Sequence, residues 1–308
     1  MNPLISILIP AYQAERTIRR CLDSVIYQSC DNSEIVVVDD GSTDSTLSIC
    51  KEFCNNDRVR LYTQENRGIA YTRQRLVELA KGDYLQFVDA DDWVESNMVE
   101  LQSKILSERD CDIIISDFIL EKPNSSIYRA QKPTSLTTDA LITDISSSKL
   151  LGVLWNKLLK KDLLEGLKFP NLRYCEDWCI CMQLFFRTSK FYYLDKALYH
   201  YDNAIVSNSL TREITPKTFK YRLEYINYLR EIQFDKHYVK EFNSQVANNA
   251  YYALVNNIYS NKQFNSLFGG ISFWNIYNKL PKRIVLIIAR HIDTSIARKV
   301  DSLFRKLI

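Results

Sequence analysis

The chain has 308 residues, of which 46% are hydrophobic and 25% are charged, and its formal net charge is +3. This length supports one large hydrophobic core and a smaller annex. Eight cysteines would suit a disulfide scaffold in a small secreted protein, but a chain of this length does not need one, and we interpret them as small buried residues. No signal peptide is visible, and the longest aliphatic run, at 284–289, is too short to cross a bilayer.

The first 90 residues alternate short apolar runs with amphipathic segments. Residues 4–9 and 34–38 have the composition of buried strands, and apolar residues within 18–26 recur at the spacing of a one-faced helix. A third strand at 59–62 and a helix at 69–80 follow, and they lead to a fourth strand. This alternation predicts an α/β domain with a mostly parallel central sheet flanked by helices.

The fourth predicted strand ends in three carboxylates, Asp89, Asp91 and Asp92. In open α/β sheets, ligands bind beyond the carboxyl ends of the strands. Carboxylates at that position suit Mg²⁺ or Mn²⁺, which proteins usually share with the phosphates of a bound nucleotide. A solvated turn is the alternative, and Asp92 is also a candidate cap for a helix beginning near Glu95.

Five short segments carry a resemblance through their order along the chain. They are IPAY at 9–12, VDDGSTD at 38–44, NRGIA at 66–70 followed by Arg73, FVDADD at 87–92 and EDW at 176–178. This order resembles the family 2 glycosyltransferases with the A-type nucleotide-sugar fold, over about residues 3–210. The chain departs from the family at Gln13, where Asn is usual, and at Thr72 and Gln74, where Ala and Asn are usual.

The resemblance implies inverting transfer of a sugar from a nucleotide donor, with Mn²⁺ or Mg²⁺ as the cofactor. Asp91 would hold the metal, Asp89 would reach the ribose or a metal-bound water, and Asp40 would hydrogen-bond the base, which favours the imide N–H of uracil in a UDP-linked donor. Arg67 and Arg73 are candidates either for phosphate contacts or for positions on a solvated surface. The predicted donor-binding residues are Pro10, Tyr12, Asp40, Asn66, Arg67, Arg73, Asp89 and Asp91.

Asp177 is the candidate catalytic base, which would take a proton from the acceptor hydroxyl. It follows Glu176 at the start of an apolar helical stretch, where two acids are also common because the helix dipole stabilises them. A carboxylate beside Trp178 can be partly desolvated, which raises its pKa and makes it a better base.

Two residues outside these segments have more than one interpretation. His200 follows a short predicted strand at 191–194, and it is either structural or a ligand to the metal or diphosphate. Lys157, in the segment WNKL at 155–158, is either an interior salt-bridge partner or a phosphate contact.

The sequence predicts a catalytic domain at 1–210, with a nucleotide-sugar half at 1–118 and an acceptor half at 119–210, and a helical C-terminal region at 211–308. The tail at 279–308 has eight Lys/Arg and two Asp, and its apolar residues fall largely on one helical face. This pattern is typical of a helix in an anionic membrane interface. A helix packed on the catalytic domain with a solvated basic face is the alternative. We expect no nucleic acid partner, because no basic and aromatic reading surface accompanies the tail.

The resemblance, together with the basic tail, therefore implies a glycosyltransferase acting on a glycan or lipid-linked acceptor, in the cytoplasm at the inner face of the plasma membrane, in bacterial surface polysaccharide assembly. A sugar-nucleotide pyrophosphorylase is a rival, but it would need a Gly-rich phosphate loop where this chain has PAYQ at 10–13. A catalytically degenerate scaffold is the second rival. The retained carboxylates Asp40, Asp89, Asp91 and Asp177 argue against it.

Overall fold

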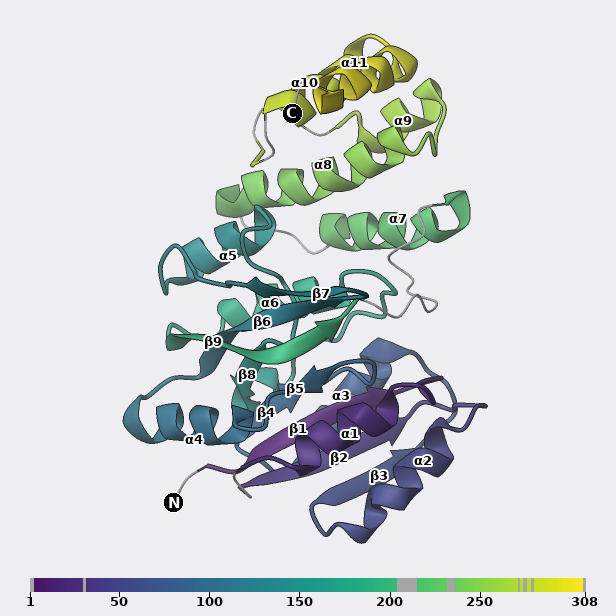
Figure 1. Cartoon of the computed structure of the whole chain (residues 1–308). Helices are drawn as coiled ribbons and strands as arrows, with labels where there is room; N and C mark the ends of the chain where they lie inside the picture. The colour runs from purple at the N-terminus through teal and green to yellow at the C-terminus, as the bar shows by residue number, and fades with distance from the viewer. Residues whose placement is uncertain are drawn as a thin grey trace. The chain divides into compact units, whose positions relative to one another are not determined.

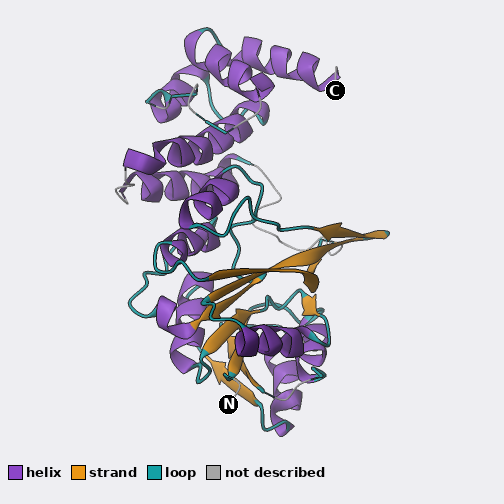
Figure 2. Ribbon diagram, turned by 90° about the vertical axis from the view of Figure 1, so that its left-hand side faces the viewer, coloured by secondary structure: helices purple, strands orange, loops and turns teal. Residues whose placement is uncertain are grey.

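The structure is a computed structural model that describes residues 3–29, 32–203, 215–231, 236–270, 272–273, 276–277 and 280–306. The chain forms two compact units, one of residues 1–141 and 150–207 and one of residues 142–149 and 208–308. The predicted division at residue 210 differs from this one chiefly in the short segment 142–149. Among the described residues, the strands belong to the first unit and the second unit is helical (Figure 2).

The first half of the first unit is a parallel sheet in the order β3-β2-β1-β4 (Figure 1). Its strands are β1 (Ile5–Ala11), β2 (Ser33–Asp39), β3 (Val59–Thr63) and β4 (Tyr84–Phe87). The helices between them are α1 (Ile18–Ile26), α2 (Thr46–Glu52) with the short η1 (Phe53–Asn55), and α3 (Ile69–Leu79). The predicted α/β architecture is therefore confirmed, and the carboxyl ends of these strands share one edge.

The second half of this unit continues the sheet as β8-β6-β9-β5, with β7 paired to β6. The strands are β5 (Trp93–Val94), β6 (Ile113–Lys122), β7 (Ser125–Arg129), β8 (Lys157–Lys160) and β9 (Phe191–Asp202). The accompanying helices are α4 (Met98–Glu108), α5 (Thr138–Ser146), η2 (Lys161–Leu164) and α6 (Glu176–Phe185). Here β6 and β9 are parallel, whereas β8 is antiparallel to both β4 and β6.

The apolar runs of the sequence form the buried strands of the first unit. Every residue of β1 and β2 is buried, because both faces of these central strands are covered. The inner face of α1 consists of Ile18, Cys21, Leu22 and Val25, all buried, as the helical spacing predicts. Each such aliphatic side chain contributes about 1.5–3 kcal/mol when fully buried.

Besides the C-terminal part of α5, the second unit is built from five helices and a short 3-10 turn among its described residues. They are α7 (Pro216–Glu231), η3 (Lys236–Tyr238), α8 (Val239–Val255), α9 (Asn261–Phe268), α10 (Leu280–His291) and α11 (Thr294–Lys306). The tail helices α10 and α11 bury Val285, Leu286, Ala289 and Ala297 in a core shared with α8 and α9. The tail thus packs on helices of its own unit, which the sequence did not predict, and only part of its apolar surface stays exposed.

The seven cysteines that the structure describes are free, and five of them are buried, as expected for small apolar residues. In the described part of the chain, no helix combines the length and the hydrophobicity needed to span a membrane.

Candidate active site

Asp40 lies at the tip of β2 and holds the loop that leads into α3. Its Oδ1 accepts hydrogen bonds from Gln64 Nε2 (2.7 Å) and the backbone N–H of Arg67 (2.9 Å), and its Oδ2 accepts one from the N–H of Gly68 (2.8 Å). A carboxylate offers about four acceptor positions, so one position on Oδ2 is left for a further donor. The carboxylate is otherwise buried, which fixes its direction.

Gln13 ties the loop after β1 to the loop after β2. Its backbone has a φ of +50°, a region where Asn is strongly favoured among residues with a side chain. Its side-chain Oε1 accepts hydrogen bonds from the N–H of Thr43 (2.8 Å) and Asp44 (3.3 Å). The side chain of Gln13, which is one methylene longer than the Asn expected at this position, therefore makes the hydrogen bonds to the loop after β2.

Four other predicted donor-site residues lie around the same strand tips. Pro10 is buried in β1, whereas Tyr12, Asn66 and Arg67 are exposed. The guanidinium of Arg67 stacks on Tyr71, 3.5 Å from the ring centroid. The exposed side chains are therefore at the surface, where a ligand has access to them.

The three carboxylates that follow β4, those of Asp89, Asp91 and Asp92, lie in different environments. Asp92 is fully buried and accepts hydrogen bonds from Tyr199 Oη (2.6 Å) and the N–H of Asp202 (2.7 Å). The prediction that Asp92 caps a helix near Glu95 is wrong, because Asn97 precedes α4 and Asp92 joins the tip to β9 instead. Burial, together with Asp91 and Asp89, raises the pKa of Asp92 well above its usual range.

Asp91 is the exposed carboxylate of the tip. Its backbone carbonyl accepts a hydrogen bond from Arg20 Nη2 (2.8 Å), which also contacts Asp202 (2.6 Å) and so fixes the loop. The protein around the side chain, followed by the negative charge of Asp89, raises the pKa of Asp91 to about 6. A cation would relieve this unfavourable negative charge.

The residues fit a divalent cation that is shared with a ligand. Among the described residues, no group of three or more His, Cys, Asp or Glu side chains could hold a metal ion alone. Mg²⁺ and Mn²⁺ are commonly bound by one or two carboxylates together with substrate phosphates, and the exposed Asp91 suits that arrangement.

Arg73 connects the tip of β4 to the start of α6. Its buried guanidinium donates to Asp89 Oδ1 from Nη2 (2.9 Å), to Glu176 Oε1 from Nη1 (2.8 Å), and to Asp177 Oδ1 from Nη1. This differs from the phosphate contact that the sequence predicts, because both terminal nitrogens are engaged by carboxylates. A guanidinium suits this role, since it stays charged and presents several donors in a fixed plane.

Asp177 lies at the N-terminal end of α6, after Cys175, which takes a left-handed conformation (φ +57°) at the N-cap. One carboxylate oxygen contacts Arg73, and Oδ2 accepts a hydrogen bond from the N–H of Leu154 (3.2 Å). Burial raises the pKa of Asp177 to about 7; Arg73 opposes this effect, and Glu176 and Asp89 add to it. A buried carboxylate with this pKa is matched to accepting a proton near neutral pH.

Lys157 organises the loop that contacts Asp177. Its fully buried Nζ donates to the carbonyl of Leu151 (3.0 Å), the carbonyl of Val153 (2.7 Å) and Asn156 Oδ1 (2.8 Å). The lysine thus forms neither the ion pair nor the phosphate contact considered from the sequence. It fixes the turn whose Leu154 N–H points at Asp177.

His200 is not placed as a metal ligand. Its Nδ1 lies 2.8 Å from Glu121 Oε1, its Nε2 lies 2.9 Å from Glu95 Oε1, and its ring stacks on Trp93. Both ring nitrogens are therefore engaged by carboxylates. The predicted short strand also extends further than expected, because β9 runs through His200 to pair with β5 and β6.

Sequence reasoning did not select three residues that complete this site. Glu176 shares Arg73 with Asp177, Tyr199 links the N–H of Asp89 to Asp92, and the N–H of Leu154 reaches Asp177. Glu176 was visible as the neighbouring acid. The other two contacts depend on long-range pairing that no local motif records.

Comparison with known proteins identifies the family. The family model for glycosyl transferase family 2 matches residues 6–183, well over half of the chain. The chain belongs to this family. The region matched contains Asp40, Arg73, Asp89, Asp91 and Asp177, whereas His200 lies beyond it.

The glycosyltransferase is 34% identical to GlyA of Streptococcus pneumoniae over 69% of this chain, but the match spans only about a third (32%) of GlyA. It is 29% identical to TuaG of Bacillus subtilis, a protein named for teichuronic acid biosynthesis, over 78% of this chain and 98% of TuaG. Its fold is similar to that of S. aureus TarS 1–349 in complex with UDP-GlcNAc, with a TM-score of 0.75, 19% identity, and coverage of 98% of this chain and 92% of TarS.

Proposed function

We propose that this protein transfers a sugar from a nucleotide-linked donor, most simply a UDP-sugar, to a hydroxyl group of a glycan or lipid-linked acceptor in polysaccharide assembly. The observation that carries this proposal is the geometry of Asp177, a buried carboxylate that Arg73 and the N–H of Leu154 orient. Family membership supports the reaction class, and the names of relatives such as TuaG support the polysaccharide setting.

In this proposal Asp177 accepts the proton of the acceptor hydroxyl as that oxygen attacks the anomeric carbon and the bond to the nucleoside diphosphate breaks. Single displacement inverts the anomeric configuration. Arg73 and the N–H of Leu154 hold the carboxylate in one direction, which removes the cost of ordering it during the reaction. Arg73 and Glu176 act as positioning residues, since they act through Asp177.

The donor would bind at the shared edge of β1, β2 and β4. The remaining acceptor position of Asp40 suits one N–H of the base, and a uracil imide is such a donor. TarS, whose fold this chain shares, was solved with UDP-GlcNAc, and this supports a UDP-linked donor here.

Asp91 is the residue that we assign to a divalent cation, either Mn²⁺ or Mg²⁺. When bound, the cation would neutralise charge that develops on the departing diphosphate. Asp89 is held by Arg73 and therefore orients toward the interior of the site, which leaves Asp91 as the exposed ligand.

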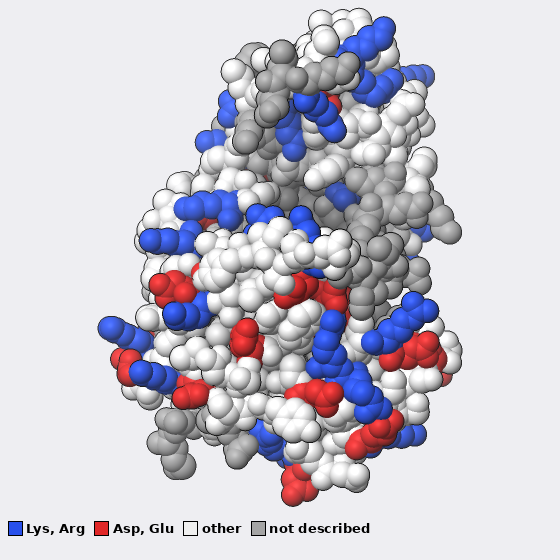
Figure 3. Space-filling view, viewed as in Figure 1, with Lys and Arg blue, Asp and Glu red and all other residues white. Residues whose placement is uncertain are grey.

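We also propose peripheral contact with an anionic phospholipid surface through the tail, at the cytoplasmic face of the membrane. Four apolar side chains remain exposed on or beside α10 and α11: Leu280 (61%), Ile292 (62%), Ile296 (44%) and Leu303 (60%). Lys and Arg side chains gather over these helices on the face seen in Figure 3. Apolar side chains flanked by cations are the composition of an interfacial helix.

The test is hydrolysis and transfer with a panel of nucleotide sugars, with Mn²⁺ or with a chelator. We expect turnover of a UDP-sugar, its loss with the chelator, and product of inverted configuration by NMR. Asp91→Asn should weaken metal-linked UDP binding in calorimetry, whereas Asp110→Asn, at an exposed carboxylate of the same unit, should not. A degenerate scaffold would bind nucleotides without turnover, and a retained configuration would exclude single displacement.

A further inference from the structure

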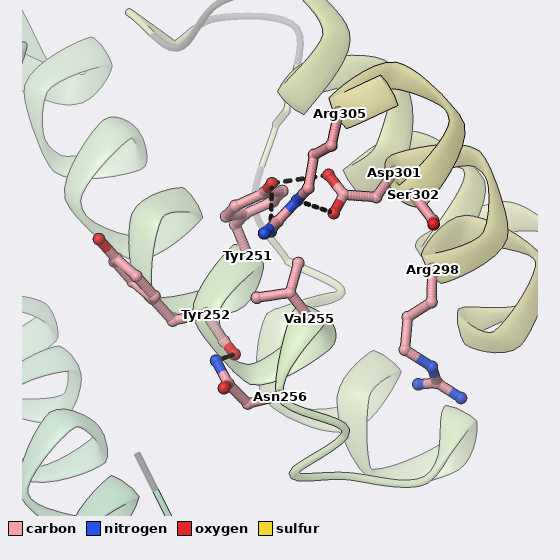
Figure 4. A pocket seen from close by; sticks show the side chains of 8 residues that line it. All are labelled: Tyr251, Tyr252, Val255, Asn256, Arg298, Asp301, Ser302 and Arg305. Carbon is pink, nitrogen blue, oxygen red and sulfur yellow. Dashed lines mark hydrogen bonds and ion pairs between the residues drawn. The ribbon is translucent and has the colours of Figure 1, made fainter. Parts of the chain in front are cut away.

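A pocket in the C-terminal unit has no role in the proposed reaction. It has a volume of about 450 Å³ and lies between the end of α8 and one side of α11 (Figure 4). The residues that line it are Tyr251, Tyr252, Val255, Asn256, Arg298, Asp301, Ser302 and Arg305. All of them follow residue 250, so they are distinct from every candidate catalytic residue.

The one carboxylate of the pocket is already neutralised. Asp301 Oδ1 accepts a hydrogen bond from Tyr251 Oη (2.6 Å), and Oδ2 accepts one from Arg305 Nε (2.8 Å). Arg305 Nη2 also donates to Tyr251 Oη (3.1 Å), which closes a triangle of three side chains. The pocket therefore offers little to a cation, while Arg305 remains 60% exposed and able to donate to a ligand.

Arg298 interacts electrostatically with Asp293, but one of its guanidinium nitrogens keeps an unused donor. Its Nη1 is shielded from solvent and has no hydrogen-bond partner among the residues that the structure describes. In Figure 4 its side chain extends from α11 beside the pocket with no interaction drawn to the other lining residues. A shielded guanidinium nitrogen without an acceptor is costly, and an anionic oxygen would satisfy it.

Two further cations border the lining tyrosines. Lys282 Nζ lies 4.5 Å from the ring centroid of Tyr251, and the guanidinium of Arg222 lies 4.9 Å from that of Tyr252. Burial lowers the pKa of Lys282 to about 8, so the ammonium is still charged at pH 7. Only Arg298 and Arg305 line the pocket, whereas Lys282 and Arg222 donate to Asn248 and Asn249 behind the tyrosines. The single lining carboxylate is paired, so the two lining guanidinium groups attract anions.

We propose that this pocket binds a phosphate ester, with Arg298, Arg305 and the Ser302 hydroxyl as donors to its oxygens. Guanidinium groups are suited to phosphate because their planar donors match two oxygens at once. Either a phospholipid headgroup or a phosphate on a soluble saccharide presents this chemistry.

The first arm of the test is calorimetric titration of the full chain with sn-glycerol 3-phosphate, with glycerol as the uncharged comparison. Arg298→Gln should weaken binding about tenfold, the scale of one charge-assisted hydrogen bond. Lys299→Gln removes the same charge from the next position of α11, which is exposed and does not line the pocket, and should change binding less than twofold.

The second arm is cosedimentation of the same variants with phosphatidylglycerol vesicles. If binding of glycerol phosphate depends on Arg298, the proposal is supported and the ligand is a soluble phosphate ester. If only vesicle binding depends on Arg298, the proposal is supported and the ligand is a phospholipid headgroup. No binding in either arm overturns it, and so does equal weakening by the two variants, which would indicate diffuse charge. Donor hydrolysis is measured in parallel, so that failure of the proposed transferase reaction is seen separately.

Discussion

The two units of this protein use positive charge in different ways. In the catalytic unit, Arg73 and Lys157 are buried and each meets several acceptors of the protein itself. In the C-terminal unit, cations such as Lys282 and Arg222 lie over tyrosine rings, and Arg298 Nη1 has no partner among the described residues. On the surface seen in Figure 3, acids and bases mix over the sheet, whereas bases predominate over α10 and α11.

In the first unit Arg73 orients carboxylates and Lys157 fixes a loop, whereas in the second unit Arg298 keeps a donor that is unused among the described residues. Substitutions in the first unit should therefore change catalysis or folding. Substitutions at the surface of the second should change association and leave chemistry intact.

The largest expected effect is that of Asp177→Asn. The amide cannot accept the acceptor proton, so we expect turnover to fall by roughly 10²-fold or more while UDP affinity stays near that of the wild type. Steady-state kinetics and calorimetry measure the two quantities. Equal losses in binding and rate would instead make Asp177 a structural residue.

The second largest effect is expected for Lys157→Met, because this substitution leaves three hydrogen-bond acceptors of a buried loop without their donor. We expect a loss of about 1–3 kcal/mol in the free energy of unfolding, measured in urea, and reduced kcat with a smaller change in KM for the donor. Lys104→Met, at an exposed lysine of α4, is the matched control and should stay within about 0.5 kcal/mol. Unchanged stability in Lys157→Met would show that the loop is fixed by other contacts.

In the C-terminal unit, replacing Ile292 and Leu303 by Ser should weaken cosedimentation with phosphatidylglycerol vesicles between about 10- and 30-fold. Each half-buried apolar side chain contributes on the order of 1 kcal/mol in the interface. Val239→Ser, at an exposed apolar residue of α8, is the control. Donor hydrolysis should be unaffected, and vesicle binding that persists in the double variant would refute the tail as the membrane contact.

Substitution is a sharper test than deletion of the tail. Because Val285, Leu286 and Ala289 belong to the core of the C-terminal unit, removal of α10 and α11 would expose that core. Loss of function in such a truncation would not separate folding from membrane binding.

The smallest effect is expected for Glu176→Gln. The negative charge of Glu176 raises the pKa of Asp177, and Glu176 also competes with Asp177 for the guanidinium of Arg73. The substitution removes both effects. The pKa of Asp177 should therefore fall. Since the base is active when deprotonated, the acid limb of kcat/KM should move to lower pH than in the wild type. A limb that stays in place or moves to higher pH would contradict this electrostatic account.

The sequence predicted the parallel half of the fold well, because local patterns determine it. The strand runs and the spacing within α1 depend on burial alone, and the observed β1, β2, β3 and β4 agree with them within one or two residues at most ends. Similarly, carboxylates after β2 and β4 had to share an edge once the strands were parallel.

The partners of these carboxylates could not be predicted from local patterns. Arg73 lies 104 residues from Asp177 and Tyr199 lies 107 residues from Asp92, so only the folded chain reveals that they meet. His200 was misplaced for the same reason, since the pairing of β9 with both β5 and β6 brings it between Glu95 and Glu121.

The central claim is that Asp177 is a buried base with a pKa near neutrality. Carbon-13 NMR of aspartate carboxyl groups, with Asp177→Asn to assign the signal, measures that pKa directly across a pH titration. The structure predicts a midpoint of about 7 for Asp177, far above that of an exposed aspartate. A midpoint near 4 would show an ordinary ion pair with Arg73 and would contradict the assignment of Asp177 as the base.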